Sequence, residues 1–231
     1  NVLFALALTA GVVAGSVVFA SAQEPEEDGS NMVVFPWVPN GSMIDDPRGF
    51  GENGPFYGTV TVQNLEDEEI TLYYAATDES LDYDDLTEWE SESLAAHEST
   101  TLSAAEIGVA TPGGGAVVQG VIENGADEPA RISAVQKQAA GEPAPTTAQT
   151  TSDHNTVAGY SGLYAEDIGT TAILPIAQIN NNWNTIIHIT NFDDETVTDV
   201  TVQFRPADGT GWSSTFTFDG DDALGPGETG T

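Results

Sequence analysis

Carboxylates are the most abundant side chains that could do chemistry in this sequence, and many of them fall in short runs. Calcium takes about six to eight oxygen ligands, often several carboxylates from one loop. Two runs are candidate calcium ligands on this ground: Asp193, Asp194 and Glu195, and Asp219, Asp221 and Asp222. The alternative is that both runs are solvated turns, because neither has the full glycine and glutamate spacing of an EF-hand loop.

Residues that could bind zinc or support catalysis are sparse. The histidines are His97, His154 and His188, which are far apart, whereas a zinc site needs clustered ligands. The chain has no cysteine, and its GYSGL segment (159–163) lacks the apolar strand that precedes a nucleophile elbow. The acidic residues fall on expected turns rather than along an aromatic cleft, as a glycosidase would need. We therefore expect a non-enzymatic protein without a certain cofactor, calcium being the candidate.

Aromatic side chains and one sequon suggest contact with glycans. Tryptophan and tyrosine could form a platform for sugar stacking, or they could belong to the core. The tryptophans are Trp37, Trp89, Trp183 and Trp212. We expect Trp183 in the core and Trp89, within an acidic stretch, at the surface. Asn40 begins an Asn-Gly-Ser sequon, which makes it a candidate glycosylation site.

The charge balance excludes several classes of partner. The 231 residues include 37 acidic and 4 basic side chains, for a formal net charge of −33. Nucleic-acid binding needs basic patches that replace phosphate counterions, so it is not expected. Anionic lipid surfaces are disfavoured for the same reason. Repulsion at this charge density fits a salt-rich or calcium-rich setting, or simply a soluble acidic secreted protein.

A segment of the chain occurs twice. Residues 56–68 read FYGTVTVQNLEDE and residues 183–195 read WNTIIHITNFDDE, which aligns Phe56 with Trp183 and Asn64 with Asn191. Each copy alternates apolar and polar residues and then reaches an acidic turn, which predicts a half-buried strand followed by a turn. Further on, residues 94–101 match residues 224–231. The repeat predicts two related β-domains.

The remaining strand candidates define the domains. In the first domain (32–140) they are 32–38, 56–64, 70–76, 99–103, 116–123 and 131–138. The acidic stretch 81–94 is expected to be a loop or a short helix. Residues 141–156, rich in Pro, Thr and Ala, read as an extended linker. The second domain (157–231) has no counterpart to the last two strands, so we expect it to be incomplete. Its sheet edge would then be open to strand addition by another chain.

The N-terminal segment has the layout of a secretory leader. Residues 2–20 are apolar, and Ala20-Ser21-Ala22 precedes the polar spacer 23–31. This favours a signal peptide over residues 1–22. The alternative is a retained apolar helix that serves as a membrane anchor or as the core of a filament. Both interpretations place the rest of the chain outside the cytoplasm, with membrane contact only through this segment.

The segment LPIAQINNNWNTIIHITN (174–191) resembles the opening of secreted repeat domains in bacterial and archaeal surface proteins. Those proteins carry tandem immunoglobulin-like or fibronectin-like repeats. The resemblance implies an all-β fold of tandem immunoglobulin-like sandwiches behind an apolar N-terminal helix, and a role in adhesion, spacing or surface-layer assembly. Its expected partners are further copies of the chain or cell-envelope components. The alternatives are a pilin-like filament subunit and a carbohydrate-binding accessory module that contacts glycans.

Overall fold

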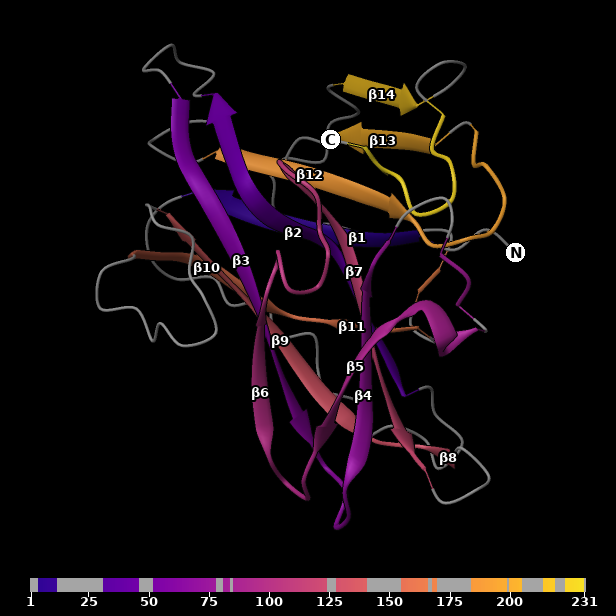
Figure 1. The fold of residues 1–231 in the computed structure, drawn as a ribbon. Helices are drawn as coiled ribbons and strands as arrows, with labels where there is room; N and C mark the ends of the chain where they lie inside the picture. The colour runs from indigo at the N-terminus through magenta and orange to yellow at the C-terminus, as the bar shows by residue number, and fades with distance from the viewer. Residues whose placement is uncertain are drawn as a thin grey trace.

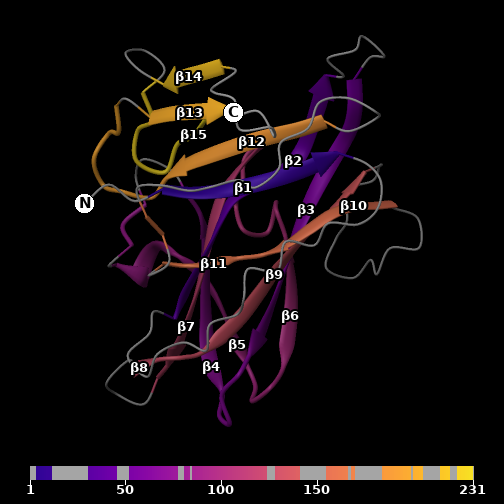
Figure 2. The same ribbon diagram turned by 180° about the vertical axis from the view of Figure 1, so that it is seen from behind.

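The computed structural model shows an all-β protein (Figures 1 and 2). It describes residues 4–11, 31–45, 52–77, 81–83, 85–123, 128–140, 155–165, 168–169, 184–198, 200–204, 214–218 and 223–230. Within these ranges helical geometry is confined to the 3₁₀ turn η1 (Leu86–Glu88) and to Ala165. No helix in the described residues is long and apolar enough to cross a membrane.

The largest sheet has 10 strands and curls on itself. Its main path runs in the order β10 (Asn155–Ser161), β9 (Ile132–Ala140), β3 (Glu52–Asn64), β2 (Met32–Asp45), β7 (Gly113–Ile122), β4 (Ile70–Ala76) and β5 (Glu90–Leu94). Three further strands join it: β6 (Ser99–Ser103) pairs with β3, β8 (Glu128–Pro129) with β7, and β11 (Leu163–Tyr164) with β2.

The curl comes from β2, which belongs to both halves of this sheet. Its first part pairs with β7 and its last part pairs with β3, with irregular register between Phe35 and Val38. Alternate side chains of the two halves then face one another in a single core. Val60, Leu72 and Val118, for example, are fully buried there. The alternating pattern of the sequence therefore positions one face of each strand inward.

Strands β2 and β7 are covered on both faces. Val33 and Val118 enter the main core, whereas their neighbours Val34 and Val117 enter a second cluster on the opposite face. Trp89, Ile168 and Phe192 cover that second face. This explains why neither strand follows a strict alternation of apolar and polar residues, because a strand buried on both sides needs no such alternation.

Several sequence predictions are refined. Strands β4 and β6 have the predicted bounds, whereas β2 and β3 continue into the polar insert as a long hairpin (Figure 1). The acidic stretch 81–94, predicted as a loop or helix, contains η1 and the strand β5 at the edge of the sheet. Residues 155–164, whose larger part we assigned to the second domain, pair with β9 and β2 of the first sheet.

The second repeat forms smaller sheets beside the first. One has the order β1 (Phe4–Gly11), β12 (Asn184–Asn191) and β15 (Thr229–Gly230), and the other pairs β13 (Val200–Phe204) with β14 (Ser214–Phe218). Ile189, Val197, Val200 and Leu224 form its core. In both ribbon views β1 and β12 run side by side.

The leader differs from the expected helix where the structure describes it. Residues 4–11 form strand β1, antiparallel to β12. Residues 12–30, the predicted leader cleavage site among them, lie outside the described residues, as does the core of the predicted linker. The segment FALALTAG places large apolar residues at positions 4, 6 and 8 with alanines between them, and this alternation of size is the strand signal that hydrophobicity alone conceals.

Candidate functional site: two asparagine corners and the joint between the repeats

The sequence repeat ends at an asparagine, and the structure shows why. Asn64 is fully buried at the end of β3. Its Nδ2 donates to the carbonyl oxygens of Glu68 (2.8 Å), Leu94 (3.1 Å) and Ala95 (3.0 Å). Its Oδ1 accepts a hydrogen bond from the backbone N–H of Glu66 at 2.8 Å. One side chain thus holds the acidic turn against the end of β5.

Asn191 repeats this arrangement in the second repeat. It is also fully buried, and its Nδ2 donates to the carbonyl oxygens of Glu195 (2.8 Å), Leu224 (3.1 Å) and Gly225 (3.1 Å). Its Oδ1 accepts from the N–H of Asp193 at 2.9 Å. Each of these partners is the sequence equivalent of a partner of Asn64. We refer to the two arrangements as the asparagine corners.

The turn that follows each corner is equivalent as well. The Glu98 carboxylate accepts from the N–H of Ala95 at 3.0 Å, and the Glu228 carboxylate accepts from the N–H of Gly225 at 2.8 Å. Both turns need a residue with positive φ, which is His97 (59°) in the first repeat and Gly227 (69°) in the second. Glycine adopts this conformation freely, whereas histidine does so less often.

The second repeat lies on the first through a joint built from polar and aromatic contacts. Thr190 Oγ1 donates to the carbonyl oxygen of Pro36 at 2.5 Å and lies 2.7 Å from Thr229 Oγ1. Thr77 Oγ1 donates to the carbonyl oxygen of Gly227 at 3.1 Å. The joint therefore ties β12 and the turn before β15 to the bend in β2 and the end of β4.

His188 and Trp37 complete this joint. Their rings are stacked with centroids 4.3 Å apart and planes 2° from parallel. His188 is 5% exposed, and burial lowers its pKa from 6.5 to about 4, so the ring is neutral at pH 7. We predicted His188 on the polar face of its strand. That face is covered by the first repeat, which alignment of the repeat alone does not reveal.

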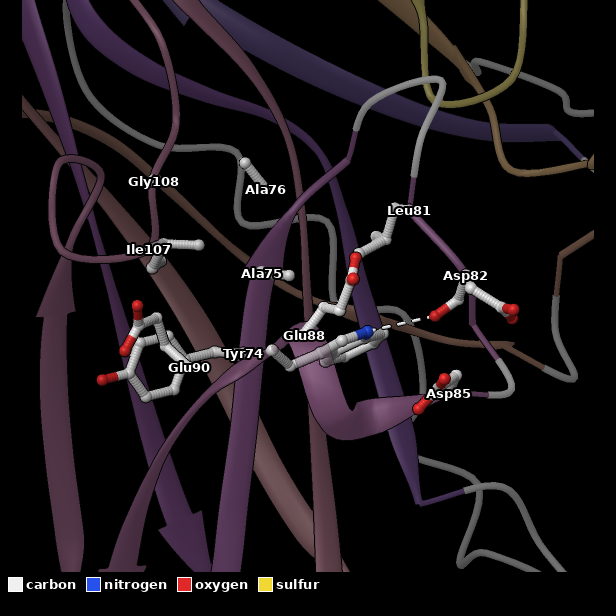
Figure 3. A pocket seen from close by; sticks show the side chains of 11 residues that line it. Tyr74, Ala75, Ala76, Leu81, Asp82, Asp85, Glu88, Glu90, Ile107 and Gly108 are labelled. Atoms are coloured by element: carbon white, nitrogen blue, oxygen red, sulfur yellow. Dashed lines mark hydrogen bonds between the residues drawn. The ribbon is translucent and has the colours of Figure 1, made fainter.

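An acidic cleft lies next to η1 (Figure 3). It has a volume of about 410 Å³ and is bordered by β4, η1 and the loop at Ile107 and Gly108. Four carboxylates line it: Asp82, Asp85, Glu88 and Glu90. Asp85 accepts from the N–H of Thr87 at 3.0 Å, and hydrogen bonding with the Thr87 side chain, followed by this backbone hydrogen bond, lowers the pKa of its carboxyl. The pKa of Tyr74 is raised, mainly because its side chain is partly buried and also because glutamates lie nearby. A negative cleft of this kind favours cationic groups.

The structure describes only some of the predicted calcium ligands. Asp193 lies in the asparagine corner, where its carboxylate accepts from the N–H of Glu195 at 3.2 Å, while Asp194 and Glu195 are exposed. Asp219, Asp221 and Asp222 lie outside the described residues. In the part of the chain that the structure describes, no three acidic or histidine side chains converge on a possible ion site. Glu66, in the corresponding first turn, pairs with Arg131 at 3.0 Å, which lowers the pKa of its carboxyl.

The predicted sites for glycans have structural roles where they are described. Trp89, expected at the surface, is 6% exposed, and its Nε1 donates to the carbonyl oxygen of Asp82 at 3.1 Å. Trp37 stacks on His188, and Trp183 and Trp212 lie outside the described residues. Asn40 Nδ2 donates to the carbonyl oxygen of Val109 at 2.7 Å, so the atom that would carry a glycan is engaged.

Comparisons with known proteins identify no relative. No family model matches the chain, and neither a curated protein nor a solved structure matches it. The asparagine corners and the joint are therefore the features of this chain that bear on its function.

Proposed function

We propose that this chain is a non-catalytic, extracellular β-repeat protein that serves in adhesion, spacing or surface-layer assembly at the cell envelope. In this proposal the curled sheet and the smaller sheets are tandem sandwiches of immunoglobulin-like type. The observation that carries it is the pair of asparagine corners. Two copies of one strand-and-turn unit, each built around a buried asparagine with equivalent partners, are typical of proteins that extend by repetition.

The joint supports a role in spacing. A spacer must transmit its orientation from one repeat to the next, which requires fixed contacts rather than a free linker. Thr190, Thr77 and the stacked pair of Trp37 and His188 provide such contacts between the two repeats. The net charge of −33 and the apolar segment before the acidic spacer fit a location outside the cytoplasm.

Protease treatment of intact cells that produce the full-length protein tests the location. We expect digestion without lysis, while a cytoplasmic marker in the same cells stays intact. The intact mass of the mature protein then shows whether the leader has been removed, because a chain that starts at Gln23 indicates a cleaved signal peptide. Recovery in the cytosolic fraction, with protection until lysis, would contradict the proposal.

A second candidate is the filament subunit that keeps its N-terminal segment. The pairing of β1 with β12 favours it, because the segment then has a place in the folded protein. It predicts a mature chain that still contains residues 4–11 and, by electron microscopy, fibres of purified protein. A mature N-terminus at Gln23 would exclude this candidate.

A further inference from the structure

The central strand of each repeat is paired on both sides, and the registers of the two repeats coincide. In the first repeat β3 lies between β6 and β9, and Gln63 opposes Ser99 on one side and Ser133 on the other. In the second repeat β12 lies between β15 and β1. Its equivalent residue, Thr190, opposes Thr229 on one side and Ala5 on the other.

Strand β1 therefore holds the position that β9 holds in the first repeat. Ile132 opposes Asn64 as Phe4 opposes Asn191, and Ala134 opposes Val62 as Leu6 opposes Ile189. The origins of the two strands differ. β9 follows β7 and β8 within the same sheet, whereas β1 comes from the other end of the sequence. A segment outside the repeat thus completes the second repeat.

The composition of β12 is that of a strand paired on both sides. Exposed edge strands commonly carry charges that prevent association with other chains. The edge strand β5 follows this rule with Glu90 and Glu92. β12 has no acidic or basic residue apart from the neutral His188, although the chain as a whole has a net charge of −33. β1 is also uncharged, so pairing the two strands brings no like charges together.

We propose that the β12 edge is a strand-acceptor site and that residues 4–11 are the strand that fills it. The ligand is an extended, uncharged, antiparallel strand with large apolar residues at alternate positions. Backbone hydrogen bonds provide the affinity, and the apolar positions of the strand provide the register. The inference goes beyond the proposed function, since it assigns a binding surface and the chemistry of its partner.

Cleavage of the full chain between β1 and β2 tests the proposal. A specific protease site is inserted between Gly29 and Ser30, and the purified protein is cut under native conditions. We expect the N-terminal fragment to co-elute with the remainder in gel filtration and to separate in urea. A fluorescent peptide of residues 2–14 should then exchange into the complex. Immediate loss of the fragment without a change in melting temperature would overturn the proposal.

A proline control that keeps every large apolar residue separates strand pairing from non-specific hydrophobic association. The control peptide carries Ala7→Pro and Ala10→Pro and retains Phe4, Leu6 and Leu8, because proline cannot donate to the ladder. We expect this peptide to exchange at least tenfold less than the parent peptide. Equal exchange of the two peptides would contradict a strand-acceptor site.

Engineered disulfides in the uncut chain test the register independently, since the protein has no cysteine of its own. The pair Leu6→Cys and Ile189→Cys joins directly opposed residues, whose Cα atoms lie about 4.5–5.5 Å apart in an antiparallel ladder. The control pair Leu6→Cys and Thr190→Cys is shifted by one residue and points to opposite faces. We expect oxidation to link the first pair within one chain, and equal linkage of both pairs would refute this register. All these readouts use purified protein that retains residues 1–22, so their outcome is independent of cellular location and of whether cells remove the leader.

Discussion

Asn64 and Asn191 explain why the repeat is conspicuous in the sequence. Each amide has two hydrogens shared among three carbonyl oxygens, and each amide oxygen accepts from the acidic turn. Aspartate has a similar shape but would present an anion to those carbonyls. Only asparagine matches this set of partners without a change in size. The residue type in the repeat is thus set by hydrogen bonding inside the corner.

We expect Asn64→Ala and Asn64→Asp to destabilise the protein by about 2–4 kcal/mol each, because both leave buried carbonyls without a donor. Gln63→Ala, at the exposed neighbouring position, is the matched control and should change stability by less than about 0.5 kcal/mol. Urea unfolding followed by tryptophan fluorescence measures the difference. Equal effects at positions 63 and 64 would show that the corner contributes little.

His188 makes the joint sensitive to acid. Its pKa of about 4 in the folded protein lies below the value of 6.5 for the exposed group, so the unfolded chain binds the proton more tightly. Stability from this group is fully present above pH 6.5 and is lost as the pH falls toward 4, by up to about 3 kcal/mol. We expect His188→Phe to remove this part of the pH dependence. Thermal melts of both proteins from pH 7.5 to 4 test this prediction. The carboxylates titrate in both proteins, so the difference between the two reports His188. Parallel curves of melting temperature against pH would contradict the buried, neutral ring.

At the scale of elements, the second repeat contacts the start of β7 at Gly115, the last of three consecutive glycines. A Cβ at Gly115 would collide with Thr77 Oγ1 and lie 3.2 Å from Thr190 Cγ2, both of which belong to the joint. A Cβ at Gly114 would meet nothing closer than 3.7 Å. The repeats can approach this closely because position 115 has no side chain.

We therefore expect Gly115→Ala to cost about 1–3 kcal/mol through overpacking, and Gly114→Ala to be neutral. The substitution at 115 should also loosen the joint. Faster amide hydrogen exchange in β12 would report this, with exchange in β4 and β9 unchanged. Equal behaviour of the two alanine variants would mean that the joint is not closely packed at this point.

Elements were predictable from sequence to different degrees. β4 and β6 follow from alternation of apolar and polar residues, because one face of each meets the core. The alternation rule does not predict β5, because Glu90 and Glu92 occupy the face that also carries the buried Leu94, and a position at the edge of the sheet permits such a charged strand. The sequence predicts a signal peptide or an apolar helix where β1 lies, because the apolar content of this segment conceals a period of two.

For the whole molecule, net charge governs the response to salt. Repulsion among 37 acidic side chains opposes the compact state, and screening relieves it. We expect the melting temperature to rise by roughly 5 °C or more between about 0.05 and 2 M NaCl. Sorbitol at matched osmolality is the control for general effects on hydration. An equal rise in sorbitol would show that charge screening is not the cause.

Calcium is predicted to stabilise the protein further if the run at 219–222 binds it. Calcium at a few millimolar, at constant ionic strength, should raise the melting temperature above the value with chelator. Asp221→Asn should reduce that increase, because a neutral amide is a weaker ligand for calcium than a carboxylate. Asp194→Asn, at an exposed position of the asparagine corner, tests the other candidate run. No difference between calcium and chelator would remove the proposal of a calcium site.

The sequence by itself determined the strand-rich character, the two copies of the strand-and-turn unit and the acidic surface. Periodicity and composition are local properties, so they can be read without a fold. Only the tertiary structure decided which segments cover each face of the strands. It buried Trp89 and His188, which sequence context marks as polar positions, and it assigned residues 155–164 to the first sheet. It also placed residues 4–11 beside β12, because strand pairing between distant segments depends on backbone edges that leave no periodic trace in the sequence.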